Sequence, residues 1–230
     1  MEYKLPERFG AVRIVSSEVK DGSMNQRDPQ GFANILRFLE ENQINKPLCI
    51  GGQPHQNKII MTAKNGVFQN TDGILTKNDF VVAVCTADCL PMMISDGKKM
   101  IGAIHLSRHN LIINTISRDL AEIFKTNEFN PADTSVFFGP HIRVGSYKAS
   151  EEFLKLIEGS KWAKYLEHKG DGVHFDLTRA ATAELEEIGI KKDNIMDCAI
   201  NTFDNENFFS FRRQNGVSPI PTFITLIFKK

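Results

Sequence analysis

The hydrophobic residues of this chain fall mostly into short runs separated by polar, glycine or proline positions, a pattern that predicts β-strands. Residues 81–84 are the clearest example, because an apolar, mainly β-branched run gives way at once to mixed positions that include Asp88. The segments predicted to be strands are residues 9–15, 47–50, 59–62, 66–69, 74–75, 81–84, 92–94, 100–104, 134–138, 195–201, 208–211 and 223–228.

Other segments repeat their apolar positions at helical spacing. Asp28-Pro29 is typical of a helix start, and this helix would bury one face that includes Phe32, Ile35 and Leu39. Two more helices are predicted at residues 113–124 and 180–188, whereas residues 153–175 are expected to be helical or irregular. Helices among so many strands favour a mixed α/β sandwich over a simple parallel sheet. Because no linker or low-complexity run divides the chain, we expect one domain over residues 1–230.

Composition narrows the class of protein. The chain is 41% hydrophobic and 24% charged, which is ordinary for a globular domain. Its 28 basic and 28 acidic residues balance, so no overall field would attract nucleic acid or an anionic membrane. No apolar stretch approaches the roughly 18 residues of a membrane span, and the first residues lack the apolar core of a signal peptide. We therefore expect a cytoplasmic protein, in which the four cysteines stay as thiols.

Three residues able to bind a metal follow predicted strands. Cys89 follows the run 81–84, His105 ends the next strand but one, and His55 follows the run 47–50 after two glycines. Cys89 and His105 would be neighbours on adjacent strands. A catalytic zinc takes three protein ligands of these kinds and leaves a fourth position open, so the inventory fits a zinc site.

Spacing alone leaves other interpretations open. The intervals of 34 residues from His55 to Cys89 and 16 from Cys89 to His105 match no compact zinc signature. A free cysteine is often a small buried hydrophobe, which is also our interpretation of Cys85, and a histidine often serves in a turn. A cysteine hydrolase without a metal, with Cys89 as nucleophile and a histidine as its base, is a further alternative.

Anion binding would need local cationic groups. Arg143 follows the strand at 134–138 in a loop, and Arg212 and Arg213 follow the strand at 208–211. Guanidinium forks suit phosphate, but a solvated loop or an ion pair would explain the same residues. Because side chains alternate along a strand, at most one of Arg212 and Arg213 can point inward.

Three motifs in order resemble the YfiH-like laccase-domain family, whose members carry Gln-Val-His, Thr-x-Asp-Cys-x-Pro and His-Ala-Gly-Trp-Arg-Gly. Here the corresponding residues are Gln53-Pro54-His55, Thr86-Ala87-Asp88-Cys89-Leu90-Pro91 and the segment that begins at His105. The similarity continues over nearly the whole chain, at residues 139–142, Tyr147, 197–198 and 208–213, and weakly at Arg13 and 23–25.

The resemblance implies an α-β-β-α layered fold and a metal held by His55, Cys89 and His105, which would also be the catalytic centre. It implies purine nucleoside phosphorylase activity, with adenosine deaminase and methylthioadenosine phosphorylase activities at the same site, so the partners would be a purine nucleoside and phosphate. The residues expected to bind substrate or phosphate are Arg13, Asn25, His109, Arg143 and Arg212. Zinc is favoured over copper, because six histidines supply one three-ligand site comfortably but not a group of four coppers.

The chain also departs from the family pattern. Where members have His-Ala-Gly-Trp-Arg-Gly, this chain has His105-Leu-Ser-Arg108-His109-Asn110. Arginine is charged at every physiological pH, whereas histidine loses its charge near neutrality, so phosphate binding by His109 would weaken between about pH 6 and 8 unless Arg108 takes over. Three hypotheses follow: a purine nucleoside enzyme, a divergent metal-binding protein with another or lost activity, and a hydrolase that edits cell-wall precursors.

Overall fold

The computed structural model describes residues 1–56, 58–113, 116–216 and 218–230, which form two main sheets and a separate hairpin. The first sheet has the order β1 (Val12–Ser16), β13 (Phe223–Lys229), β6 (Val81–Thr86), β2 (Leu48–Gly51) and β4 (Gly66–Phe68). The second has the order β12 (Ile195–Asp197), β9 (Ser135–Phe138), β7 (Leu90–Ser95), β8 (Ile101–Leu106), β5 (Gly73–Thr76) and β3 (Ile59–Met61). Both sheets mix parallel and antiparallel pairs.

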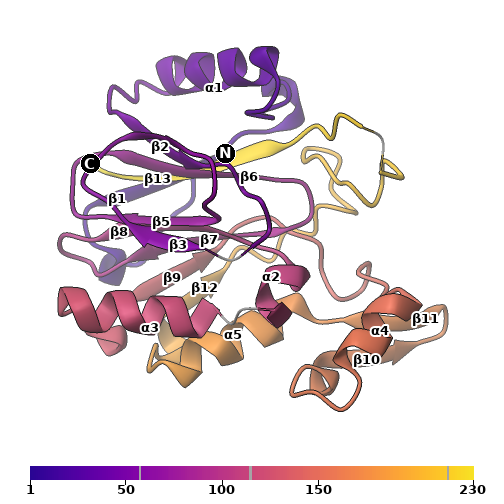
Figure 1. Ribbon diagram of the computed structural model, residues 1–230. Helices are drawn as coiled ribbons and strands as arrows, with labels where there is room; N and C mark the ends of the chain where they lie inside the picture. Colours follow the sequence, from indigo (N-terminus) through magenta and orange to yellow (C-terminus); the bar gives the residue numbers. More distant parts are fainter. Residues whose placement is uncertain (57, 114–115, 217) are drawn as a thin grey trace.

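The two sheets stack, and helices cover their outer faces (Figure 1). Helix α1 (Pro29–Glu41) packs on the first sheet, while α3 (Ile116–Asn127) and α5 (Leu177–Glu187) pack on the second. Strand β6 lies between two layers, because Val81 and Ala83 face α1 and Val82 and Val84 face the second sheet. A strand buried on both faces is a continuous apolar run. The structure therefore confirms the α-β-β-α layered α/β fold that the resemblance implies.

Helix α1 begins where its sequence predicts. The Asp28 carboxylate accepts a hydrogen bond from the backbone N–H of Gln30 at 3.1 Å, and Pro29 occupies the first helical position. Ile35, Phe38 and Leu39 are buried against the first sheet. The helix thus fixes the loop before it, residues 23–28, at one end of strands β6 and β13.

The register of the second sheet brings distant residues together. Strands β7 and β8 are antiparallel with Pro91 opposite His105, so Cys89, which lies just before β7, is next to His105. Strand β5 pairs with the other edge of β8, and the His105 N–H donates to the carbonyl of Asp72 at 2.8 Å. The prediction that Cys89 and His105 are neighbours is confirmed.

The helix expected at 113–124 corresponds to α3, and a further helix, α2 (Arg108–Ile113), precedes it; residues 114–115 lie outside the described residues. Two predicted segments differ in the structure. The strand expected at 208–211 is wrong: these residues form a loop that leads into a turn, because the Arg213 guanidinium donates to the carbonyls of Thr202 and Phe203. Residues 151–175 contain α4 (Glu151–Ile157) and a hairpin of β10 (Leu166–Lys169) and β11 (Gly172–Phe175), which the sequence did not predict.

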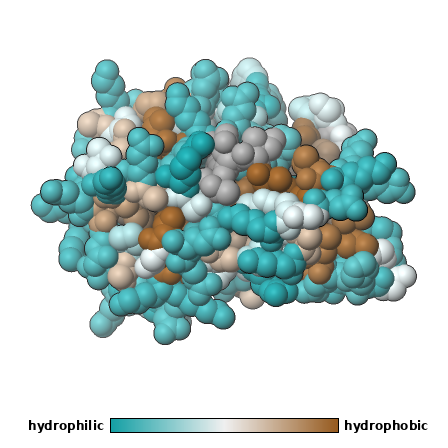
Figure 2. Space-filling model, turned by 60° about the horizontal axis from the view of Figure 1, so that its bottom comes forward, coloured by the Kyte–Doolittle hydropathy of each residue, from teal (hydrophilic) through white to brown (hydrophobic). Residues whose placement is uncertain are grey.

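Short 3-10 helices lie between these elements, at Glu7–Phe9, Val19–Asp21, Pro131–Asp133, Ala163–Tyr165 and Lys192–Asn194. None of the helices within the described ranges is long and apolar enough to cross a membrane. The face drawn in Figure 2 is largely hydrophilic, and patches of hydrophobic residues interrupt it.

Candidate metal centre and active site

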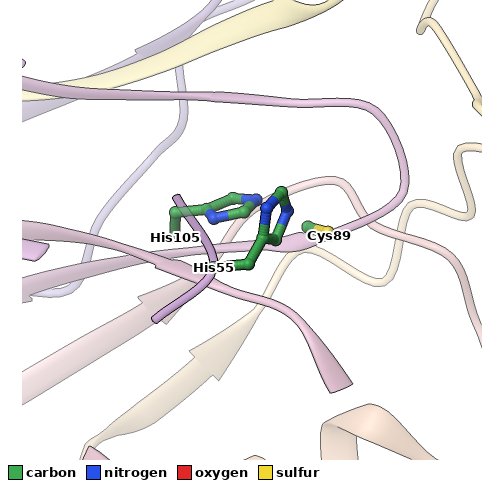
Figure 3. Close-up of side chains that lie close together, drawn as sticks. All are labelled: His55, Cys89 and His105. Carbon is green, nitrogen blue, oxygen red and sulfur yellow. The ribbon is translucent and has the colours of Figure 1, made fainter. Parts of the chain in front are cut away.

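His55, Cys89 and His105 lie close together (Figure 3), although they come from the loop between β2 and β3, the turn between β6 and β7, and strand β8. The ligand atoms of the three side chains lie within 4.8 Å of one another. The two imidazole rings meet edge to face, with centroids 4.7 Å apart and an angle of 72° between their planes. His105 is buried, Cys89 is partly buried and His55 is exposed, so the cluster is accessible from the side of His55.

The loop that carries His55 is held in an unusual backbone conformation. Gln53 and His55 have φ angles of 56° and 60°, in the left-handed region that residues other than glycine seldom adopt. The Gln53 side chain offsets this cost by pairing with the backbone of Cys85, donating to its carbonyl at 2.5 Å and accepting from its N–H at 2.8 Å. Gln53 thereby ties the loop to the end of β6.

Asp72 fixes the other side of the loop and faces His105. Its carboxylate accepts hydrogen bonds from the backbone N–H groups of His55 at 2.9 Å and Gln56 at 2.8 Å. Its Oδ1 also lies 3.7 Å from Nδ1 of His105, an ion-pair distance that is too long for a hydrogen bond. Burial raises the pKa of Asp72, but His105 and the two backbone donors outweigh burial and leave the pKa below its usual value. Asp72 is therefore ionised at neutral pH.

Cys89 and His105 form a charge pair. Burial opposes both charges, yet the two histidines lower the pKa of Cys89 to about 6, and Cys89 together with Asp72 raises the pKa of His105 to about 9. At neutral pH the metal-free site thus holds a thiolate beside an imidazolium. A thiolate is the form of cysteine that binds metals.

The donor set fits a transition-metal ion. Nδ1 of His105 is buried without a hydrogen-bond partner in the described part of the chain, and it faces the Asp72 carboxylate. This arrangement leaves Nε2 for a metal, and a carboxylate behind a ligating histidine is a common way to orient the ring. Within the described ranges, this is the one group of three or more His, Cys, Asp or Glu side chains placed to hold a metal ion.

The cluster lines a cavity of about 580 Å³, a size suited to a small-molecule ligand. Arg108 and Arg212 line the same cavity and flank the Tyr147 ring, with guanidinium carbons 5.4 and 5.7 Å from its centroid. Arg108 also lies 4.5 Å above the Phe153 ring, and its NH1 is buried with no hydrogen-bond partner among the residues described. A buried donor of this kind is costly unless a ligand accepts from it.

Comparison with known proteins identifies the family. The family model described as multi-copper polyphenol oxidoreductase laccase matches residues 21–228. The chain belongs to this family. It is 27% identical over 199 residues to a purine nucleoside phosphorylase from Campylobacter jejuni, covering 86% of this chain and 83% of that protein. It is also 28% identical over 208 residues to a purine nucleoside phosphorylase from Rickettsia conorii, covering 85% of this chain and 81% of that protein.

Solved structures share the fold. YlmD from Geobacillus stearothermophilus superposes with a TM-score of 0.86 at 19% identity, covering 98% of this chain and 94% of that one. YfiH from Bacillus licheniformis superposes with a TM-score of 0.83 at 18% identity, covering 95% and 93%. The resemblance to the YfiH-like family, drawn from three short motifs, is confirmed.

The structure separates the residues expected to bind substrate into two groups. Asn25, His109 and Arg212 line the cavity beside the metal cluster. Arg13 does not: it forms an ion pair with Glu2 at 2.8 Å on strand β1. Arg143 also lies outside the cavity lining, where it forms an ion pair with Asp197 at 2.6 Å. Each of these two arginines is therefore paired with a carboxylate outside the cavity.

Asp88, which precedes Cys89 in the motif, fixes two segments of the chain. Its carboxylate accepts from the Thr202 hydroxyl at 2.6 Å and from the backbone N–H of Arg212 at 2.7 Å, so it joins the chain before Cys89 to the loop that carries Arg212. The carboxylate behind His105 is Asp72, which was not among the predicted site residues. In the sequence, Asp72 is a lone aspartate directly before a buried strand. This pattern fits a residue in a turn as well as a buried hydrogen-bond acceptor.

Sequence reasoning also missed several neutral residues of the cavity wall. They include Gln26, Gln53, Thr86 and Thr222. Gln53 and Thr86 stood in motifs that identified the family, so a clue was present for these two. Gln26 and Thr222 had none, because they enter the cavity only through the packing of α1 and β13 against β6.

Proposed function

We propose that the protein is a zinc-dependent purine nucleoside phosphorylase. In this reaction a phosphate oxygen bonds to the anomeric carbon of the ribose, the glycosidic C–N bond breaks, and its electron pair leaves with the purine, which takes up a proton. The observation that carries the proposal is one cavity that combines the His55–Cys89–His105 cluster with an unpaired, buried guanidinium nitrogen on Arg108. The names of the relatives from Campylobacter jejuni and Rickettsia conorii support it.

Arg108 is the residue best suited to hold phosphate. Its guanidinium stacks on Phe153 and Tyr147, which fixes its plane, and NH1 lacks an acceptor in the described structure. Arg212 is partly engaged, because its NH1 donates to the carbonyl of Lys148 at 3.1 Å. A planar, permanently charged fork held in one orientation suits bidentate binding of a phosphate. Arg108 would thus supply the positive charge that the family motif places one residue later, where this chain has His109.

His55, Cys89 and His105 would hold the zinc, with Asp72 orienting His105 from behind. A zinc ion in such a three-ligand site offers an open position for an anion or for a water of lowered pKa. One thiolate and two imidazoles are a ligand set that suits zinc, and the single three-residue cluster in the described ranges is too small for a multi-copper centre. Arg108 and Arg212 add positive charge where the incoming phosphate would lie.

The same cavity could accept related substrates. Hydrolytic deamination of adenosine needs an activated water, and phosphorolysis of methylthioadenosine needs the same phosphate site, so we include both as secondary activities. A nucleoside panel with and without phosphate separates them. Hypoxanthine released from inosine only with phosphate identifies a phosphorylase, whereas inosine formed from adenosine without phosphate identifies a deaminase.

The test compares zinc-loaded wild type with Cys89→Ser and, as a matched control, Cys198→Ser, whose thiol lies outside the cavity lining. We expect Cys89→Ser to lose zinc and turnover together, and Cys198→Ser to keep both. Full zinc content without turnover on any nucleoside would instead indicate a divergent member of the family. Hydrolysis that needs neither phosphate nor metal and is lost in Cys89→Ser would favour a cysteine hydrolase. Cleavage of mischarged muropeptides in place of nucleosides would favour cell-wall editing.

A further inference from the structure

A second, uncharged group of residues lines the cavity, where three segments meet. Thr86 ends β6, Thr222 precedes β13, and Gln26 belongs to the loop before α1. Thr86 lies opposite Phe223 in the pairing of β6 with β13, and the N–H of Met24 donates to the carbonyl of Thr222 at 2.7 Å. This wall is therefore built from backbone pairing of the first sheet.

All three side chains of this wall have a buried oxygen without a hydrogen-bond partner in the described structure, but that of Thr222 lies against the Cys85 thiol, which leaves Gln26 and Thr86 with unused hydrogen-bonding capacity. The Gln26 amide donates to the carbonyl of Gly51, which identifies its nitrogen and leaves Oε1 as an acceptor, yet the buried Oε1 has no partner in the described structure. Thr86 is 1% exposed, and its hydroxyl likewise has no partner among the described residues. Buried polar atoms are paired in the great majority of cases, so unpaired ones on a cavity wall point to a ligand.

The chemistry of these two groups selects what they can bind. Gln26 Oε1 only accepts, so it needs a ligand group that donates, and the Thr86 hydroxyl can donate or accept. A fully ionised phosphate offers only acceptors and cannot satisfy Gln26. A sugar hydroxyl satisfies both, since it donates and accepts. The cavity also offers an aromatic surface for a flat base, because Phe211 lines it with 43% of its surface exposed.

We propose that Thr86 and Gln26 form the subsite that recognises the ribose hydroxyls of the nucleoside. This inference rests on the proposed function and deepens it. It divides the cavity into a neutral hydrogen-bonding wall for the sugar and a cationic wall around Arg108 for the anion.

The test is equilibrium binding of inosine, 2′-deoxyinosine and 3′-deoxyinosine to the zinc-loaded protein, measured by calorimetry without phosphate. Wild type is compared with Thr86→Val, which keeps the shape and removes the unpaired hydroxyl. Thr225→Val is the matched control, because Thr225 is equally buried but its hydroxyl pairs with Ser16 at 2.8 Å on the strand interior. Since the Thr86 hydroxyl has no partner in the fold as described, we expect Thr86→Val to melt no lower than wild type.

We expect Thr86→Val to weaken inosine binding about three- to tenfold, the loss of one neutral hydrogen bond, and to leave one deoxynucleoside unaffected. Equal losses for all three nucleosides would place Thr86 against the base or the 5′ hydroxyl, away from the 2′ and 3′ hydroxyls, and would overturn the proposal, as would unchanged inosine binding. Turnover is measured separately. If nucleoside binding depends on Thr86 but no phosphorolysis occurs, the ribose subsite is upheld and the phosphorylase function is rejected. If phosphorolysis occurs but nucleoside binding does not depend on Thr86, the phosphorylase function is upheld and the subsite is rejected.

Discussion

Replacing Asp72 by Asn tests whether one buried carboxylate organises the metal site. The substitution keeps the side chain's shape but removes its charge and one of its two acceptor oxygens. In the structure those oxygens accept from the backbone of His55 and Gln56, and Oδ1 lies 3.7 Å from Nδ1 of His105. Asp72→Asn should therefore disturb two of the three metal ligands without touching the metal.

The expected size of the effect has two parts. Loss of a partner behind a ligating histidine typically costs about 10- to 100-fold in metal affinity, or about 1.4 to 2.8 kcal/mol. The orphaned backbone N–H of His55 or Gln56 loses a charge-assisted hydrogen bond, which costs about 1.5 to 3 kcal/mol of stability. For a protein of this length that stability loss corresponds to a fall in melting temperature of about 3 to 10 °C.

The assay is zinc competition against a chromogenic chelator, with melting followed by circular dichroism. Asp96→Asn is the matched control, because the Asp96 carboxylate also accepts several backbone N–H groups, from Lys98, Lys99 and Met100, in the turn between β7 and β8. We expect Asp96→Asn to lower stability and leave zinc affinity unchanged. Zinc affinity of Asp72→Asn equal to that of wild type would refute the role we assign to this carboxylate.

Other predictions concern the charges around the site. Iodoacetamide at pH 7 should alkylate Cys89 first in the metal-free protein, because the two histidines outweigh burial and lower the pKa of Cys89 to about 6. Burial raises the pKa of the other three thiols to about 11 or 12. The rate of Cys89 alkylation should fall as the pH drops through 6, and bound zinc should protect Cys89. Arg108→Gln should raise the KM for phosphate about 10- to 100-fold, whereas His109→Gln should change it little. A phosphate KM that rises between pH 6 and 8 in wild type but not in His109→Gln would transfer this role to His109. Arg143→Gln should lower the melting temperature, through loss of its ion pair with Asp197, and leave the KM for phosphate unchanged.

The sequence predicted the layered fold and the cluster because both depend on local patterns. Short apolar runs define strands β2, β6, β7 and β8, and the three metal ligands follow or end such strands. The direction in which a long side chain points is not determined by the neighbouring sequence. Arg13 and Arg143 stood in plausible motif positions but are turned to Glu2 and Asp197, partners that only the sheet registers bring close.

The loop at residues 208–216 shows a second limit of sequence patterns. Its alternating phenylalanines predict a strand, but Arg213 donates to the carbonyls of Thr202, Phe203 and Phe208, and these bonds replace a strand ladder. Arg212 reaches the cavity as a consequence, because Asp88 accepts from its backbone N–H. Such side-chain to backbone bonds leave no periodic signal in a sequence.

The origin of the three metal ligands has a mechanical consequence. His55 lies in the connection from β2 of the first sheet to β3 of the second, Cys89 lies in the connection from β6 of the first sheet to β7 of the second, and His105 lies in β8. An ion bound by all three would tie both of these connections to one strand of the second sheet, closing a chain segment of fifty residues. Moving either connection would then have to break a coordination bond, so the ion that prepares the cavity for chemistry would also fix the chain at two points where it passes between the sheets.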